Sequence, residues 1–81
     1  MNNLKENPKK RLAIELAHQM DYERKMRIEP LREWEKEEVR EVGNKLRMDI
    51  VKSGYSVEDI LFLAEQYKTL SLADYMRWIN D

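Results

Sequence analysis

The chain has 81 residues, of which 38% are charged and 42% hydrophobic, and its formal net charge is −1. A chain of this length forms one small domain that buries only about 60% of its unfolded surface, so good helix packing or a second subunit is needed for stability. It has no cysteine and a single histidine, which excludes disulfides, cysteine-based zinc sites and histidine-rich metal sites, and no cofactor is expected.

The first predicted element is a long helix over about residues 8–28. Residues 1–7 are expected to form a disordered tail, and residues 8–81 a single helical domain. Asn7 and Pro8 make a helix start, because Asn accepts from first-turn amides and Pro suits the first helical position. One face of this helix then holds Leu12, Ala13, Leu16, Ala17 and Met20, and Ile28 extends the same arc.

A second long helix is predicted after Pro30, which ends or kinks the first helix and also suits the first turn of the next one. Glu35 falls inside its apolar stripe, so its first turn is expected to protrude past the core. Gly43 could break this helix, but the stripe keeps its phase, which favours continuity as far as Ser53 and Gly54. The stripe consists of Leu31, Val39, Val42, Leu46 and Ile50, with Trp34 at its edge.

Two shorter helices are predicted to follow, and each begins with a Ser and an acid three residues later. In the helix from Ser56 to about Thr69, Phe62 points nearly opposite the other apolar residues, so the helix is expected to be buried on two sides. In the last helix, from Ser71, one face holds Leu72, Tyr75, Met76 and Ile79, with Trp78 beside it. The predicted fold class is all-α, a small bundle of about four helices, two of them long and antiparallel and two short.

No pattern indicates catalysis, so the chain is predicted not to be an enzyme. His18 lies just off the apolar arc of the first helix and has no Ser or Cys beside it in the sequence, which favours a boundary residue over a general base. The five Glu of "EWEKEEVRE" alternate with Lys and Arg, as is typical of a solvated helix face. No phosphate-binding loop or nucleophile elbow is present.

Nucleic-acid binding is the alternative function, through two basic clusters of the first helix. Residues 53–81 carry two Lys or Arg against five Asp or Glu, and the isoelectric point is near 5.9. A nucleic-acid binder usually has a concentrated basic face and a high isoelectric point, so solvation or pairing within the chain is favoured first and an acidic protein partner second. The clusters consist of Lys9, Lys10, Arg11, Arg24, Lys25 and Arg27.

The segment "GYSVEDILFLAEQY", residues 54–67, suits either part of a helix-turn-helix or one arm of a hairpin that binds a protein. A helix-turn-helix needs a tight turn, often with Gly, and a recognition helix that presents polar side chains to base edges. Here the turn "TLS" has no Gly, and the last helix offers only Arg77 and Asn80 among acids and apolar residues. The protein-binding hairpin is therefore favoured.

Residues 42–67 resemble the helical hairpin of the SinI family of Gram-positive anti-repressors. The matching residues are Gly54, Tyr55, Ser56, Val57, Glu58, Asp59, Ile60 and the apolar run Leu61-Phe62-Leu63. Val57 stands where that family often has Pro, and the basic N-terminal helix has no counterpart in the family. The resemblance implies an element that dimerises or sequesters a repressor.

The expected function is that of a small non-enzymatic regulator or adaptor, similar in size and charge balance to phage and mobile-element regulators, that acts by binding a protein. A homodimer is expected because amphipathic helices in so small a chain need a partner. Without a run of about 18 apolar residues or an apolar signal segment, the protein is expected to be cytoplasmic and not associated with a membrane. The predicted partner-binding residues are Phe62, Trp78, Tyr75 and Trp34.

Overall fold

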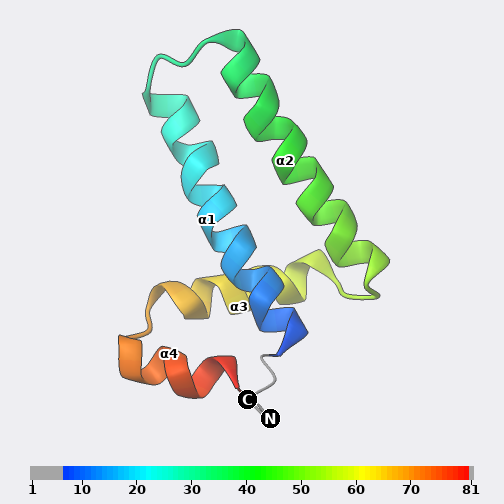
Figure 1. Ribbon diagram of the computed structural model, residues 1–81, viewed down its shortest axis with the longest axis vertical. Helices are drawn as coiled ribbons and strands as arrows, with labels where there is room; N and C mark the ends of the chain where they lie inside the picture. The colour runs from blue at the N-terminus through cyan, green and yellow to red at the C-terminus, as the bar shows by residue number, and fades with distance from the viewer. Residues whose placement is uncertain (1–6, 81) are drawn as a thin grey trace, which may run out of the picture.

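The computed structural model describes residues 7–80, which form four helices (Figure 1). The helices are α1 (Pro8–Ile28), α2 (Glu33–Lys52), α3 (Val57–Lys68) and α4 (Leu72–Ile79). In Figure 1, α1 and α2 run antiparallel, α3 crosses the first half of α1, and α4 follows below α3. The predicted bundle of two long and two short helices is confirmed. The predicted tail lies outside the described residues, except for Asn7.

Three helices begin at the capping residues that the sequence predicts. The Asn7 side chain accepts a hydrogen bond from the backbone N–H of Lys9 at 2.9 Å. The hydroxyls of Ser56 and Ser71 each accept one from the backbone N–H three residues later, at 3.3 and 3.2 Å. These bonds occupy amides that have no partner within the helix, which is why the helix starts follow from local sequence.

The junction between α1 and α2 differs in one respect from its prediction. Pro30 ends α1, and Glu29 before it adopts the extended conformation that a following proline favours. However, α2 begins at Glu33 and not at Pro30. The backbone N–H of Arg32 donates to Oε1 of Glu35 at 3.1 Å, so Glu35 interrupts the apolar stripe because it stabilises the helix start.

The corner between α2 and α3 forms at Gly54, as predicted. Gly54 has a φ of 85°, in the left-handed region that residues with a Cβ rarely adopt. Its N–H donates to the Val51 carbonyl at 2.9 Å, and the N–H of Tyr55 donates to the Ile50 carbonyl at 3.2 Å. This arrangement ends α2 and turns the chain so that α3 passes across α1.

The hydrophobic core lies where α1, the last turns of α2, and α3 meet. The predicted arc of α1 is confirmed from Leu12 to Met20, but Ile28 was wrongly included: it is 78% exposed, because it lies in the last turn of α1, far from α3. Val42 is also exposed, since its neighbour Gly43 faces α1 instead. The buried core residues are Ala13, Leu16, Ala17, Ile50, Ile60 and Ala64.

Polar side chains fill the contact between α1 and α2 beyond the core. Gln19 is only 6% exposed, and its amide donates to the Val39 carbonyl at 2.8 Å and to Glu23 at 3.2 Å. Arg47 donates to both carboxylate oxygens of Glu23, each at 3.0 Å. The hydrogen bond from Arg47 lowers the pKa of Glu23, against the opposing effect of burial, and it raises the pKa of Arg47.

Gly43 leaves the space that these polar groups occupy. A Cβ at this position would lie 2.5 Å from Oε2 of Glu23 and 3.0 Å from Nε2 of Gln19. Because glycine has no side chain, the carboxylate and the amide can lie directly against the backbone of α2. The predicted continuity of α2 across Gly43 is confirmed, and the glycine serves helix packing and does not break the helix.

The last helix is attached to the first turn of α1 through its own C-terminal carbonyls. The backbone N–H of Asn7 donates to the Ile79 carbonyl at 2.9 Å, and the Lys10 ammonium donates to the Trp78 carbonyl at 2.7 Å. Helix-end carbonyls lack partners within the helix and attract cations. Because Trp78 and Ile79 face inward, Leu72 and Met76 of the predicted face are exposed, which corrects that part of the prediction.

Replacing Glu23 by Gln is expected to lower the free energy of unfolding at pH 7 by about 1 to 2 kcal/mol, because a partly buried charged pair is lost. Since the pKa of Glu23 is lowered on folding, its contribution is complete above the unfolded-state pKa and is lost as the pH falls through the folded-state pKa. The wild-type protein should therefore lose this increment between about pH 5 and pH 3, unlike the variant. Thermal unfolding followed by circular dichroism, repeated over this pH range, measures how the stability of the wild-type protein and of the variant depends on pH. The same dependence in both proteins would contradict the pairing.

Gly43→Ala is expected to destabilise the protein more in the wild-type background than in a Glu23→Ala background. Alanine improves helix propensity by about 1 kcal/mol, but its methyl group displaces the carboxylate that Arg47 binds. Urea unfolding of the four proteins gives the coupling energy between the two positions. Additive effects would mean that the methyl group fits without displacing Glu23.

Candidate protein-binding surface

An open groove of about 640 Å³ lies beside the α2–α3 corner, between the last turns of α2 and the start of α3. Met48 and Val51 form its α2 side, and both are more than half exposed. They lie with Asn44 at 4- and 3-residue spacing, so the three share a helix face that points away from α1. The groove is lined by Asn44, Arg47, Met48, Val51, Lys52 and Val57.

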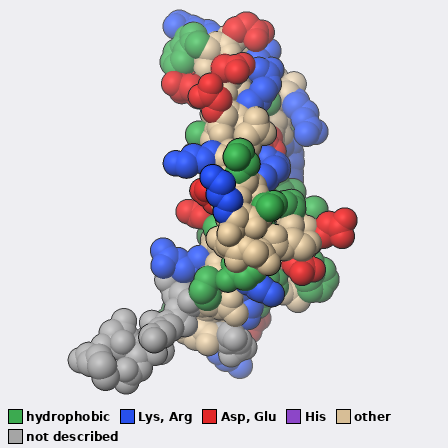
Figure 2. All heavy atoms as spheres, turned by 90° about the vertical axis from the view of Figure 1, so that its right-hand side faces the viewer, with side chains coloured by type: hydrophobic (Ala, Val, Ile, Leu, Met, Phe, Trp, Pro, Cys, Tyr) green, Lys and Arg blue, Asp and Glu red, His purple; other side chains and the backbone are tan. Residues whose placement is uncertain are grey.

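A second groove, of about 340 Å³, continues the first between α1 and α3. Both are lined by Arg47 and Val57, so the two hollows adjoin, and together they are called here the apolar groove. Viewed from the α2 side, Figure 2 shows hydrophobic side chains exposed around the α2–α3 corner, with Lys and Arg side chains nearby. The second groove adds Leu16, Met20, Glu23, Arg24, Arg27 and Leu61.

The rim of the apolar groove is basic. Arg24, Arg27, Arg47 and Lys52 line it, and Glu23 is the single acid among its lining residues. The Glu23 carboxylate already receives two hydrogen bonds from Arg47, so its charge is compensated there. Arg24 lies 3.7 Å from Asp21, so Arg27 and Lys52 supply the positive charge at the edge of the groove, around an apolar floor.

Phe62, a predicted partner-binding residue, lies on the outward side of α3 and is 65% exposed. Glu58 and Glu65, four residues before it and three after it, share this side and are also exposed. The prediction that both sides of α3 are buried is wrong. Among the described residues, none covers the Phe62 ring well enough to bury it. The outward side of α3, called here the acidic ridge, thus presents Phe62 between Glu58 and Glu65.

The other three predicted partner-binding residues lie in two further places. Trp34 is 56% exposed in the first turn of α2, at the end of the molecule opposite α4. Tyr75 and Trp78 are half-buried on α4 and contact Tyr67 of α3, with ring centroids 5.9 and 6.0 Å away. The structure therefore does not bring the four aromatic residues together.

The rings of Tyr67, Tyr75 and Trp78 hold α4 against α3. Trp78 Nε1 donates to Gln66 at 3.3 Å, and the Lys10 ammonium lies 5.1 Å from the centre of its ring. The His18 ring lies 5.9 Å from the Tyr67 ring, with Nε2 3.4 Å from the hydroxyl. His18 is thus an exposed residue at the edge of this cluster, in agreement with the boundary position that the sequence predicts.

The six basic residues of the alternative function do not form one face. Lys10 contacts Trp78, whereas the Lys9 ammonium lies 5.3 Å from the centre of the Tyr55 ring, at the α2–α3 corner. Arg24 lies 3.7 Å from Asp21 and, with Arg27, lines the apolar groove. Lys25 is exposed in the last turn of α1.

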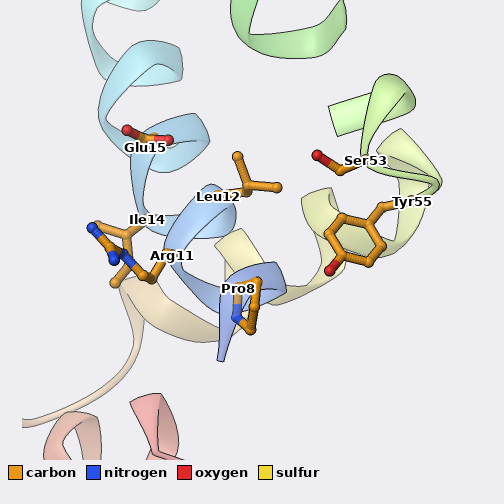
Figure 3. Close-up of a pocket in the computed structure, with 7 residues that line it drawn as sticks. All are labelled: Pro8, Arg11, Leu12, Ile14, Glu15, Ser53 and Tyr55. Atoms are coloured by element: carbon orange, nitrogen blue, oxygen red, sulfur yellow. The ribbon is translucent and has the colours of Figure 1, made fainter. Parts of the chain in front are cut away.

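Arg11 lines a third hollow, of about 530 Å³, between α1 and the α2–α3 corner. Figure 3 shows its lining side chains, which come from the first two turns of α1 and from Ser53 and Tyr55. Leu12 points into the space between them, and Arg11 and Glu15 supply the charged groups on the α1 side. This hollow is separate from the apolar groove, with which it shares no residue.

Residues 7–80 also bear on two further functional classes, metal binding and membrane insertion. Across this range, no three His, Cys, Asp or Glu side chains are grouped so that they could hold a metal ion. Nor does any helix in the described part combine the length and hydrophobicity that crossing a bilayer requires. Comparison with known proteins adds no relative, since no protein-family model, curated protein or solved structure matches the chain.

Sequence reasoning missed the α2 side of the apolar groove. Met48 and Val51 lie outside the apolar stripe that packs on α1, and their spacing from each other is the signal that could have identified a second face. That signal is short, because Asn44 and Lys52 flank the two residues. Only the position of α3 beside them turns the face into a groove.

Trp78→Ala is expected to lower the free energy of unfolding by about 2 to 3 kcal/mol, because Trp78 joins α4 to α3 and to Lys10. Trp34→Ala, the matched control at an exposed position, should change it by less than about 0.5 kcal/mol. Urea unfolding followed by circular dichroism measures both. A larger effect at Trp34 would mean that Trp34, and not Trp78, stabilises the fold.

Proposed function

We propose that this chain is a small non-enzymatic regulatory or adaptor protein that acts by binding another protein chain through its α2–α3 hairpin. The observation that supports this most directly is the apolar groove, where Met48 and Val51 are exposed in one hollow, Leu61 is exposed in the next, and Val57 lines both. Exposed apolar surface of this kind marks interaction sites on small soluble proteins, because removing it from water is favourable.

The chemistry of the groove defines what it would bind. Helices α1, α2 and α3 line it, and grooves between helices accept a helix that presents apolar side chains at 3- and 4-residue spacing. Met20 and Met48 are flexible and polarisable, so they adapt to the shape of an inserted side chain. The basic rim favours a ligand whose apolar residues are flanked by Asp or Glu.

The resemblance of residues 42–67 to the SinI-type hairpin supports the same class of function. These residues span the last turns of α2, the corner at Gly54 and nearly all of α3, which together carry most of the apolar groove. In this proposal the hairpin is a dimerisation or repressor-binding element of a cytoplasmic regulator of the phage or mobile-element type.

Nucleic-acid binding remains the alternative, but no specific observation favours it. Lys9 and Lys10 lie against aromatic rings of different segments, Tyr55 at the α2–α3 corner and Trp78 of α4. Binding to a phosphate backbone requires cations that reach it together. The dispersed positions of these cations therefore favour protein binding over nucleic-acid binding.

Photo-crosslinking from the groove tests the proposal. A chain with p-benzoylphenylalanine at Val51 is expected to form an adduct of higher mass when cells of the native host are irradiated. The same probe at Ile28, which is exposed at the far end of α1, is the matched control and should form none. The Val51 adduct should be sensitive to protease and resistant to nuclease.

Two results would contradict the proposed function. Equal crosslinking from Val51 and Ile28, or none from Val51, would mean that the groove does not bind a protein. A nuclease-sensitive adduct would instead support the nucleic-acid alternative.

A further inference from the structure

We propose that the apolar groove binds the acidic ridge of a second copy of this chain, so that Phe62 of each copy inserts into the groove of the other. This inference rests on the proposed function and names the partner. It starts from Phe62, a large aromatic residue that the fold leaves 65% exposed on the outward side of α3. An apolar residue of this size contributes most when it is buried in a pocket of a partner.

The groove and the ridge are complementary in polarity. The groove offers Met48, Val51, Val57 and Leu61 as an apolar floor, which suits an inserted ring. Burying one phenylalanine side chain in such surroundings stabilises association, because its apolar surface is removed from water. Because the exchange is mutual, each dimer gains this contribution twice.

They are also complementary in charge. Glu58 and Glu65 flank Phe62 on the ridge, whereas Lys52 and Arg27 line the groove. Arg47 and Arg24, which line it too, already pair with Glu23 and Asp21. The acids of the ridge would therefore approach bases at the rim of the groove. The formal net charge of −1 gives two copies little overall repulsion.

The positions of ridge and groove on α3 suit a closed pair. Leu61 lines the groove and Phe62, the next residue, forms the ridge, so α3 carries part of both surfaces. A twofold axis that places the two α3 helices antiparallel makes both insertions at once. Such an interface uses the same surface on each copy and closes as a dimer, without leaving an open groove for further copies.

The test is the mass of the purified full chain, measured by sedimentation equilibrium from about 1 µM to 1 mM, a range that covers weak and moderate dimers. The wild-type chain is expected to move from 9.9 kDa to twice that mass. Phe62→Ala should raise the dissociation constant about 30-fold or more, as loss of a binding hot spot does. Ile28→Ala, which removes an equally exposed apolar side chain far from the groove, should leave it unchanged.

A charge exchange tests the orientation. Glu65→Lys and Lys52→Glu should each weaken the dimer about 5- to 10-fold, because each places like charges together across the interface. The two changes in one chain should restore association toward the wild-type value, since opposite charges again meet. Circular dichroism of each variant checks that its helices are intact.

Three results would overturn the inference: a wild-type mass that stays at 9.9 kDa up to 1 mM, a Phe62→Ala dimer as tight as the wild-type dimer, or no recovery in the double variant. A monomeric wild-type chain whose Val51 probe crosslinks to a different protein would reject the second copy and retain the proposed function. A monomeric chain with no Val51 adduct would reject both.

Discussion

The close approach of α1 to α2 at Gly43 decides which surfaces of this protein face solvent. Gln19 and Glu23 of α1 occupy the space that a side chain at Gly43 would take, and Arg47 binds the carboxylate from α2. This contact fixes the rotation of α2 about its own axis. With Gly43 and Ile50 turned toward α1, Met48 lies on the far side of α2 and Val51 on its flank, where both are more than half exposed. The apolar groove is therefore a consequence of how a glycine packs in the middle of a helix.

The first helix supports each of the other three by a different kind of contact. It packs against α3 through small and branched apolar side chains, chiefly Ala13, Leu16 and Ala17. It holds α2 through polar groups, and it holds α4 through the Trp78 carbonyl and ring, both of which Lys10 contacts. Because α4 is short, these few contacts and its aromatic residues must fix its position. Because apolar, polar and cationic contacts on α1 are not interchangeable, each of the other three helices can pack on α1 in only one place.

The sequence predicts this fold well where structure depends on local chemistry, and poorly where it depends on rotation of a helix. The ends of α1, α3 and α4 follow from capping residues, and the corner follows from Gly54, because each acts within a few residues. Periodicity identifies the apolar arc of a helix, but it does not show which part of the arc packs against another helix. This is why Val42 and Ile28, which belong to such arcs, are exposed. The exposure of Phe62 follows from its angular position on α3, whereas the groove needs three helices in their final places.

The link between the two ends of the described chain has a consequence for the order of folding. Lys10 and Trp78 lie 68 positions apart, and their contact can form only after α4 has been synthesised. The hairpin of α1 and α2 depends on much closer pairs, such as Gln19 and Val39, 20 positions apart. Contacts that close long loops form late, because they cost more chain entropy. We therefore expect α1 and α2 to associate first, and α4 to dock last and to open first when the native state fluctuates.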